Sequence, residues 1–175
     1  MRIRPVTPKD AESIDNINAK LTKERFSSFF DGNQKNAEQL IAELTQFDHM
    51  LVLETETEPQ ELCAAVLLKV NHQIFLRRMA TLRIIVDQKW QGQGLGKALM
   101  ETALELADNE LMMERVEVEI PTDNVGALKL CKAAGFKVEG IAKDWMRNPD
   151  GHFVDAYLMA HCRNCLLYTS DAADD

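Results

Sequence analysis

A glycine-rich turn is the stretch of this sequence whose residue types and spacing best fit a chemical role. It reads Gln91-Gly92-Gln93-Gly94-Leu95-Gly96, with glycine at three alternate positions. Because glycine has no Cβ, such a turn leaves a row of backbone N–H groups accessible. If a helix begins here, its first N–H groups also lack an intrahelical partner, and the helix dipole adds partial positive charge. The turn therefore predicts an anion site suited to phosphate, and to pyrophosphate in particular.

The spacing of these glycines argues against two other phosphate-binding motifs. A Gly-x-Gly-x-x-Gly fingerprint needs its third glycine one residue later, and a P-loop needs Gly-Lys followed by Ser or Thr. The alternative that the turn only joins a strand to a helix stays open at this point.

The elements around the turn must hold it in place. The apolar run Leu82–Val86 before it predicts a buried strand, and the pattern of Lys97–Leu104 after it predicts an amphipathic helix. Further helices are expected to begin near Pro8, Asn36 and Asn124. Further strands are expected over 3–6, 50–54, 62–70, 114–120, 136–142 and 152–161. The order β-α-α-β-β-β-α-β-α-β-β predicts a mixed α/β fold in one layered domain.

Composition limits the classes of protein to consider. The 175 residues are 46% hydrophobic and 27% charged, which is ordinary for a globular protein. No apolar run reaches the length of about 18 residues that spans a bilayer, and no signal segment begins the chain, so we expect a cytoplasmic protein without a membrane partner. A formal net charge of −8 argues against nucleic-acid binding. The four histidines show no ligand spacing, and we assign no metal.

The last residues, 165–175, do not read as part of the domain. The run Cys165-Leu166-Leu167-Tyr168-Thr169-Ser170-Asp171-Ala172-Ala173-Asp174-Asp175 resembles, residue for residue, one reading frame of a transposon-derived adapter used in DNA library preparation. We interpret it as translated adapter rather than a natural acidic tail, and we assign residues 1–164 to the domain. Excluding it removes three acids, so that −8 becomes −5. It also removes the apparent Cys162-x-x-Cys165 motif, and we expect this tail to make no core contacts.

A second motif lies downstream of the glycine turn. It reads Asn124-Val125-Gly126-Ala127-Leu128-Lys129-Leu130-Cys131-Lys132-Ala133-Ala134-Gly135-Phe136. In this order the two motifs resemble the signatures of the GNAT family of N-acetyltransferases, Gln/Arg-x-x-Gly-x-Gly/Ala and Asn-x-x-Ala-x-x-Leu-Tyr-x-x-x-Gly-Phe. The resemblance extends from Ile3 to about His161. From Arg78 onward the chain is most similar to bacterial L-amino-acid N-acetyltransferases of this family.

The resemblance implies a single-domain GNAT fold, with a mixed, mostly antiparallel sheet flanked by helices and two splayed central strands. The strands ending at Val86 and Ile120 would separate, and the pantetheine arm of acetyl-CoA would insert between them. Backbone groups of Ile85 and Val86 would meet this arm, and a backbone N–H near them would stabilise the developing oxyanion. The other residues implied to bind the coenzyme are Gln91, Gly92, Gln93, Gly94, Leu95, Gly96, Lys97 and Asn124.

The catalytic residues that the resemblance implies are less uniform. Glu119 occupies a position that some family members use as the general base, and Glu117 is expected on the same strand face. Both could equally be solvent-facing strand acids. The acid that is common on the central strand is replaced by Thr81, and the tyrosine of many members by Cys131. Cys131 is a candidate proton donor to the leaving thiolate, with a small apolar packing role as the alternative.

The resulting functional hypothesis is an acetyl-CoA-dependent N-acetyltransferase that uses direct attack in a ternary complex. The expected acceptor is the primary amine of a small molecule such as an amino acid. Two alternatives are a protein N-terminal or lysine acetyltransferase, and a coenzyme-A-binding regulatory module with little turnover. A homodimer is common in the family. Phe26, Phe29 and Phe30 form either core packing between two helices or an apolar wall of the acceptor pocket.

Overall fold

The computed structural model describes residues 1–24, 29–30, 35–73, 75–76, 78–148 and 150–163. The tail and Phe26 lie outside this part of the chain. Its strands are β1 (Arg2–Pro5), β2 (His49–Glu54), β3 (Leu62–Val70), β4 (Met79–Val86), β5 (Arg115–Pro121), β6 (Lys137–Arg147) and β7 (Phe153–Cys162). Its α-helices are α1 (Ala11–Glu24), α2 (Ala37–Ala42), α3 (Leu95–Glu105) and α4 (Val125–Ala133). None of the described helices is long and apolar enough to cross a membrane.

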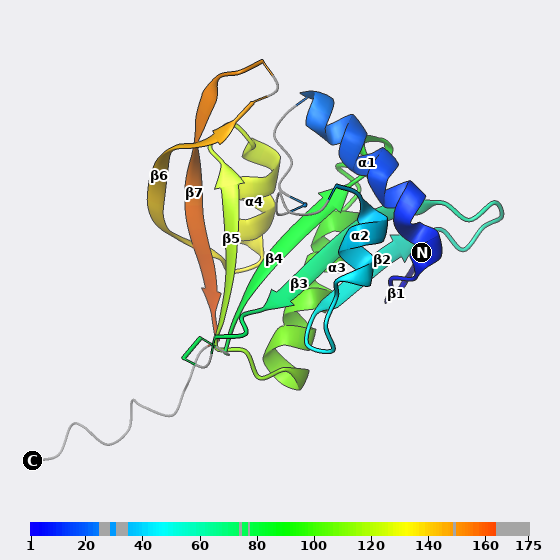
Figure 1. Cartoon of the computed structure of the whole chain (residues 1–175), viewed down its shortest axis with the longest axis horizontal. Coiled ribbons are helices and arrows are strands. Elements are labelled where there is room, and N and C mark those ends of the chain that lie inside the picture. Colours follow the sequence, from blue (N-terminus) through cyan, green and yellow to red (C-terminus); the bar gives the residue numbers. More distant parts are fainter. Residues whose placement is uncertain (25–28, 31–34, 74, 77, 149, 164–175) are drawn as a thin grey trace, which may run out of the picture.

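The seven strands form one sheet in the order β1-β2-β3-β4-β5-β7-β6 (Figure 1). Strands β4 and β5 pair in parallel, and every other neighbouring pair is antiparallel. The mixed, mostly antiparallel α/β fold is thus confirmed, as is the predicted order of elements.

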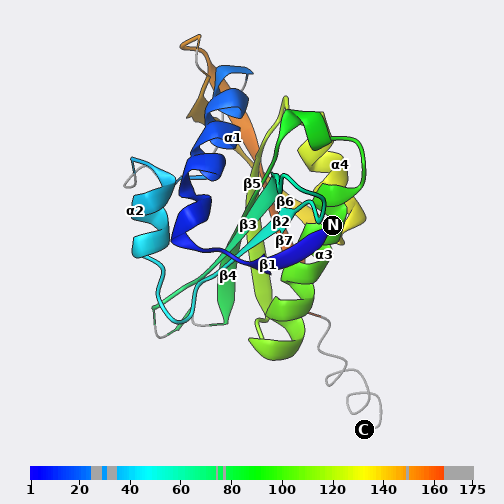
Figure 2. The same cartoon turned by 90° about the vertical axis from the view of Figure 1, so that its right-hand side faces the viewer.

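Helices cover both faces of the sheet and make two apolar cores (Figure 2). On one face α1 and α2 bury Ile14, Ile17 and Leu40 against β2, β3 and β4. On the other face α3 buries Leu99 and Met100 in a cluster that also includes residues of β3, β4, β5 and α4. The alternation of side chains along each strand supplies both cores, because successive residues point to opposite faces.

The terminal hairpin extends further than its apolar pattern predicts. The first strand was expected over 136–142, but β6 continues to Arg147. Its register with β7 shifts between Ala142 and Met146, and Asp144 there has a φ of 49°. Such an irregularity re-aims side chains along a strand. It brings Trp145 to β5, where its Nε1 donates a hydrogen bond to Glu119 Oε2 at 3.0 Å.

The start of α3 is packed closely against β4 and α4. A Cβ added to Gly96 would lie 3.3 Å from Val86 Cγ2 and 3.4 Å from Leu130 Cδ2. Gly126 holds the same position in α4, as the second residue of the helix, but there the nearest atom to an added Cβ is Asn124 Oδ1 at 4.0 Å. Close packing therefore requires glycine at position 96 but not at position 126.

We predict opposite effects for alanine at these two positions. Alanine favours a helix over glycine by up to about 1 kcal/mol, so Gly126→Ala should leave the melting temperature unchanged or raise it. In Gly96→Ala this gain is opposed by the tight approach of the new Cβ to Val86 Cγ2 at 3.3 Å, because the β-branched side chain of Val86 is stiff. We expect its melting temperature to lie at least about 2–4 °C below that of Gly126→Ala, as about 1 kcal/mol gives for a chain of this size. Equal melting temperatures in a thermal unfolding experiment would contradict the close approach.

Candidate active site

The central feature of the site is an opening between the two parallel strands. Pairing between β4 and β5 covers only three residue pairs and ends at Thr81 and Glu117. Beyond that point β4 stays paired with β3 as far as Val86, and β5 stays paired with β7 as far as Pro121. The two strands therefore separate while each keeps its outer partner, and the divergence is visible in Figure 1.

The register shows which backbone groups face the opening. The Met79 carbonyl accepts from the Asn71 N–H, and the Asp87 N–H donates to the Cys63 carbonyl, so odd-numbered residues of β4 direct their backbone to β3. Successive residues of a strand face opposite edges. The N–H groups of Ile84 and Val86 therefore face the opening, where the described residues provide no backbone partner.

This register corrects one expectation. Ile85 is paired with Ala65 of β3, so its backbone does not face the opening. Its neighbour Ile84 takes the place expected for it, one residue earlier in the chain. Val86 keeps its expected place, and its carbonyl accepts a hydrogen bond from Gln91 Nε2 at 3.1 Å.

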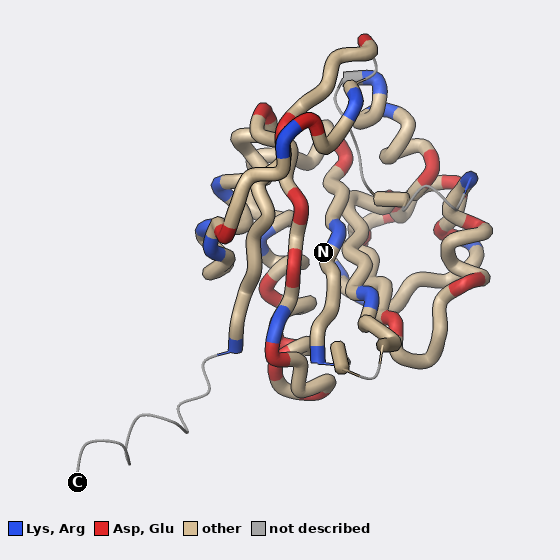
Figure 3. Tube along the Cα trace, turned by 60° about the vertical axis from the view of Figure 1, so that its left-hand side comes forward, with Lys and Arg blue, Asp and Glu red and all other residues tan. Residues whose placement is uncertain are grey.

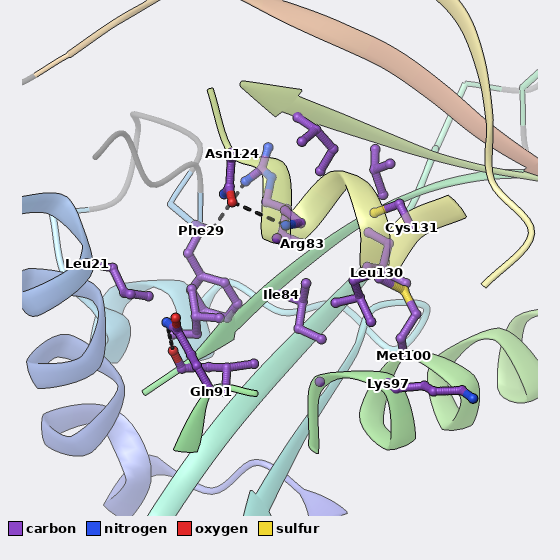
Figure 4. A pocket seen from close by; sticks show the side chains of 18 of the residues that line it. Leu21, Phe29, Arg83, Ile84, Gln91, Lys97, Met100, Asn124, Leu130 and Cys131 are labelled. Atoms are coloured by element: carbon purple, nitrogen blue, oxygen red, sulfur yellow. Dashed lines mark hydrogen bonds between the residues drawn. The ribbon is translucent and has the colours of Figure 1, made fainter. Parts of the chain in front are cut away.

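A cavity of about 530 Å³ passes through the sheet at this opening (Figure 4). On the face of α3 and α4 its walls include Met100, Leu130 and Cys131, and on the face of α1 they include Leu21 and Phe29. The residues expected to bind the coenzyme that line it are Ile85, Val86, Gln91, Gly92, Gly94, Gly96, Lys97 and Asn124. Gln93 and Leu95 do not line it. The Gln93 side chain donates from Nε2 to the Lys89 carbonyl, and the Leu95 side chain packs against the core.

The glycine turn has the backbone conformation that its sequence requires. Gly92 and Gly94 have φ values of 74° and 79°, in the left-handed region that favours glycine. Gly94 is the N-cap of α3, and its carbonyl accepts from the Ala98 N–H. The N–H groups of Leu95, Gly96 and Lys97 precede that first helical bond and have no partner within the helix. The turn therefore presents donors and the positive end of a helix dipole at the cavity.

A buried carboxylate fixes the connection between β4 and the turn. Asp87 accepts hydrogen bonds from Lys20 Nζ at 2.9 Å and from the Lys89 N–H at 3.0 Å. Burial raises the pKa of Asp87, but these two bonds outweigh it, so the pKa lies below its ordinary value. The charged Asp87 thus joins α1 to the end of β4, next to the opening.

Asn124 caps α4 and also lies in the cavity wall. At the N-cap its Oδ1 accepts from the Ala127 N–H at 3.2 Å. The start of α4 is therefore held at the cavity wall by a capping side chain, which substitution by alanine would remove.

The two acids of β5 have different surroundings. Glu117 accepts a hydrogen bond from Arg115 Nε at 2.6 Å, and it does not line the cavity. Glu119 lines the cavity, and its described partner is the neutral indole of Trp145. Basic and acidic residues are interspersed along the chain (Figure 3), and among the described residues Glu119 is the acid that lines this cavity. In the described part of the chain, no group of three or more His, Cys, Asp or Glu side chains could hold a metal ion.

Cys131 lies in the cavity wall but is almost fully buried, with 1% of its surface exposed. Burial raises the pKa of its thiol to about 12. Thr81, which replaces the acid common on this strand, lies at the paired end of β4 and outside the cavity lining. Neither side chain supplies a readily ionised group to the cavity.

Phe29 and Arg83 line the cavity on the side of α1. Phe29 is buried in the core below α1 and α2 and also lines the cavity, so packing and wall functions coincide in it. Phe30 packs edge-on against it, with ring centroids 5.9 Å apart. Arg83 lines the same side and was not expected in the site. The available signal was a single charged residue within the apolar run Leu82–Val86.

Comparison with known proteins identifies relatives over part of the chain. It is 40% identical to the L-amino acid N-acetyltransferase AaaT of Escherichia coli over 86 residues, 49% of this chain and 52% of that protein. It is 34% identical over 64 residues to an uncharacterized N-acetyltransferase of Methanocaldococcus jannaschii, covering 37% of this chain and 28% of that protein. The chain thus spans about half the length of the first relative and less of the second.

Solved structures and a family model extend the comparison. A GNAT-family acetyltransferase of Streptococcus pneumoniae superposes with a TM-score of 0.78 at 22% identity, covering 93% of this chain and 99% of that one. The ribosomal-protein-alanine N-acetyltransferase of Brucella melitensis superposes with a TM-score of 0.80 at 18% identity. The superposition covers 93% of this chain and 100% of that one. These two likenesses establish the fold. The sequence model described as the acetyltransferase (GNAT) family matches residues 15–136, and the chain therefore belongs to that family.

Proposed function

We propose that this chain transfers the acetyl group of acetyl-CoA to the amine of a small molecule, an amino acid. The observation that carries the proposal is the cavity that passes through the sheet between β4 and β5. One of its ends meets the start of α3, and the other meets the acid Glu119. The E. coli relative, an L-amino acid N-acetyltransferase, supports the class of acceptor.

The cosubstrate of this family, acetyl-CoA, fits the residues at the start of α3. A diphosphate needs several donors at close range, and the N–H groups of Gly96 and Lys97, which line the cavity and have no partner within the helix, provide two of them. Gly92 and Gly94 leave open space within 4 Å of where a Cβ would stand, so the backbone is accessible. The Lys97 side chain adds a positive charge at the same end of the cavity.

The edge of β4 fits the arm that carries the thioester. Its amides need backbone donors and acceptors, and the separated strands leave those of Ile84 and Val86 available. An N–H of this edge would stabilise the negative charge that develops on the thioester oxygen. Loss of one such donor typically costs about 2.7–4 kcal/mol of transition-state stabilisation.

The transfer requires one proton acceptor and no covalent enzyme intermediate. The amine nitrogen forms a bond to the acetyl carbon, the carbon–sulfur bond breaks, and sulfur leaves with the electron pair. Glu119 takes the proton that the nitrogen must lose, directly or through water. Cys131, with a pKa of about 12, has little thiolate at neutral pH and so does not favour an acetyl-cysteine route.

The same thiol is poorly suited to protonate the leaving sulfur. Burial holds the pKa of Cys131 well above that of an ordinary thiol, which is near ~8.5, so proton transfer from Cys131 to a thiolate of that kind is unfavourable. We therefore propose that water protonates the thiolate, and that Cys131 packs between α4 and the core.

The test of the proposed function combines binding and turnover. Calorimetric titration with coenzyme A should release or absorb heat with one-to-one stoichiometry. Thiol release from acetyl-CoA should then depend on added amine, and apolar amino acids should be among the active ones because Leu21 and Phe29 line the acceptor side. Binding without amine-dependent thiol release would identify a coenzyme-binding module instead, and the absence of binding would overturn both.

We predict that the two acids of β5 differ in their effect on rate. Glu119→Gln should lower kcat at neutral pH by about 10²–10⁴-fold, the usual contribution of a general base. Glu117→Gln is the matched control, because it removes the same charge from the same strand face at a position already paired with Arg115. Steady-state kinetics should show its kcat within about threefold of the parent. Equal losses in both variants would contradict the assignment of Glu119.

For Cys131 we predict little change in kcat on substitution by alanine. A proton donor removed from its position would cost about 10²–10⁴-fold, whereas a packing residue should cost stability and leave saturated turnover within about threefold. Thiol release at saturating substrates, with a melting curve on the same sample, separates the two effects. A loss of more than tenfold in kcat with an unchanged melting temperature would indicate that Cys131 is a proton donor. In that case Cys131→Tyr should keep a high kcat.

A further inference from the structure

Two side chains of opposite charge stand across the opening from each other. Thr81 and Glu117 form the last pair of β4 with β5, so Arg83 and Glu119 are the next residues on the same face of the sheet. Both line the cavity. No ion pair joins them, or joins Arg83 to any other carboxylate of the described residues. The separation of the strands therefore keeps apart two charges that continued pairing would place opposite each other.

The surroundings of Arg83 leave its guanidinium able to bind an anion. Its one described hydrogen bond runs from Nη1 to the Phe29 carbonyl at 3.5 Å, which is long for such a bond. A guanidinium has five N–H donors and binds a carboxylate through two parallel hydrogen bonds. The side chain is half-buried among apolar cavity walls, where an unpaired charge is costly. In Figure 4 it lies with Phe29, on the opposite side of the cavity from Lys97.

We infer that Arg83 and Glu119 together select an α-amino acid as the acceptor, with Arg83 binding its carboxylate and Glu119 its amine. An α-amino acid carries both groups on one carbon, so it can bridge the two charges while its side chain contacts Leu21 and Phe29. The inference rests on the proposed acetyl transfer and specifies its substrate class. Arg83 acts as a specificity residue, because it contacts the acceptor away from the nitrogen that reacts.

The same charges disfavour the other amines considered for this chain. A polyamine or a lysine side chain would place no negative group against Arg83, and a polyamine would add a second positive one. A protein N-terminus carries a neutral amide where an amino acid carries its carboxylate. Each would leave the Arg83 charge unpaired in the cavity, which lowers its affinity relative to an amino acid.

The experiment compares amino acids with the amines formed by removing their carboxylate. The pairs are L-phenylalanine with 2-phenylethylamine, L-leucine with 3-methylbutylamine, and L-methionine with 3-(methylthio)propylamine, each assayed by thiol release. In the parent chain at least one amino acid should exceed its amine in kcat/KM by about tenfold to a hundredfold, the range of a hydrogen-bonded charge. Arg83→Gln should raise KM for that amino acid by a similar factor and leave its amine unchanged, which removes the preference. Arg83→Lys should retain part of it.

Two controls keep a folding defect from imitating this result. Arg78→Gln removes a positive charge just before β4, from a side chain paired with Glu114 and outside the cavity lining, and should keep the preference. Coenzyme A affinity, measured by calorimetry, should be the same in Arg83→Gln and the parent. A parent that acetylates both members of each pair equally, or an Arg83→Gln variant that loses both equally, would overturn the role of Arg83 and leave acetyl transfer standing. No thiol release with any amine would overturn the proposed function and this inference with it.

Discussion

Backbone pairing between β4 and β5 stops after Thr81 and Glu117, although both strands continue for several residues. Each backbone group left without a partner in a buried setting costs about 1–3 kcal/mol, so a sheet normally closes such a gap. Here the outer neighbours β3 and β7 hold both strands along their full length, while the beginnings of α3 and α4 lie at the gap. The opening is therefore maintained by the packing around it and leaves polar groups for a ligand to satisfy.

Because successive side chains along a strand point to opposite faces of the sheet, the site is divided between the two faces. Even-numbered side chains of β4 and β5 enter the core beneath α3, and odd-numbered ones face the side of α1. As a result the glycine turn and Cys131 belong to one half of the cavity, and Arg83, Phe29 and Glu119 belong to the other. A donor and an acceptor that enter from opposite faces can meet at the gap without competing for the same wall.

The order of elements and the glycine turn were accessible from local patterns, namely apolar periodicity and capping residues such as Asn36 and Asn124. The separated central strands were expected only through the resemblance of two ordered motifs to the GNAT family. Besides Arg83, three features of the site were not accessible from the sequence. Whether Ile84 or Ile85 faces the opening depends on a register of one residue, which the apolar run Leu82–Val86 does not encode. The difference between Glu117 and Glu119 arises from Arg115 and from Trp145, which arrives through an irregularity late in β6. The pKa of Cys131 depends on burial.

The backbone pairing that joins the two halves of the sheet consists of three residue pairs at one end of β4 and β5, and a shared core beneath α3 packs both strands together. On either side of these pairs the strands stay hydrogen-bonded to their outer neighbours, apart from the register shifts within β2–β3 and β6–β7. Met79, Ala80 and Val116 belong to these pairs and lie outside the cavity lining. We therefore expect substitutions at these positions to change how far β4 and β5 separate, and with it the width of the opening, without replacing a residue that lines the cavity.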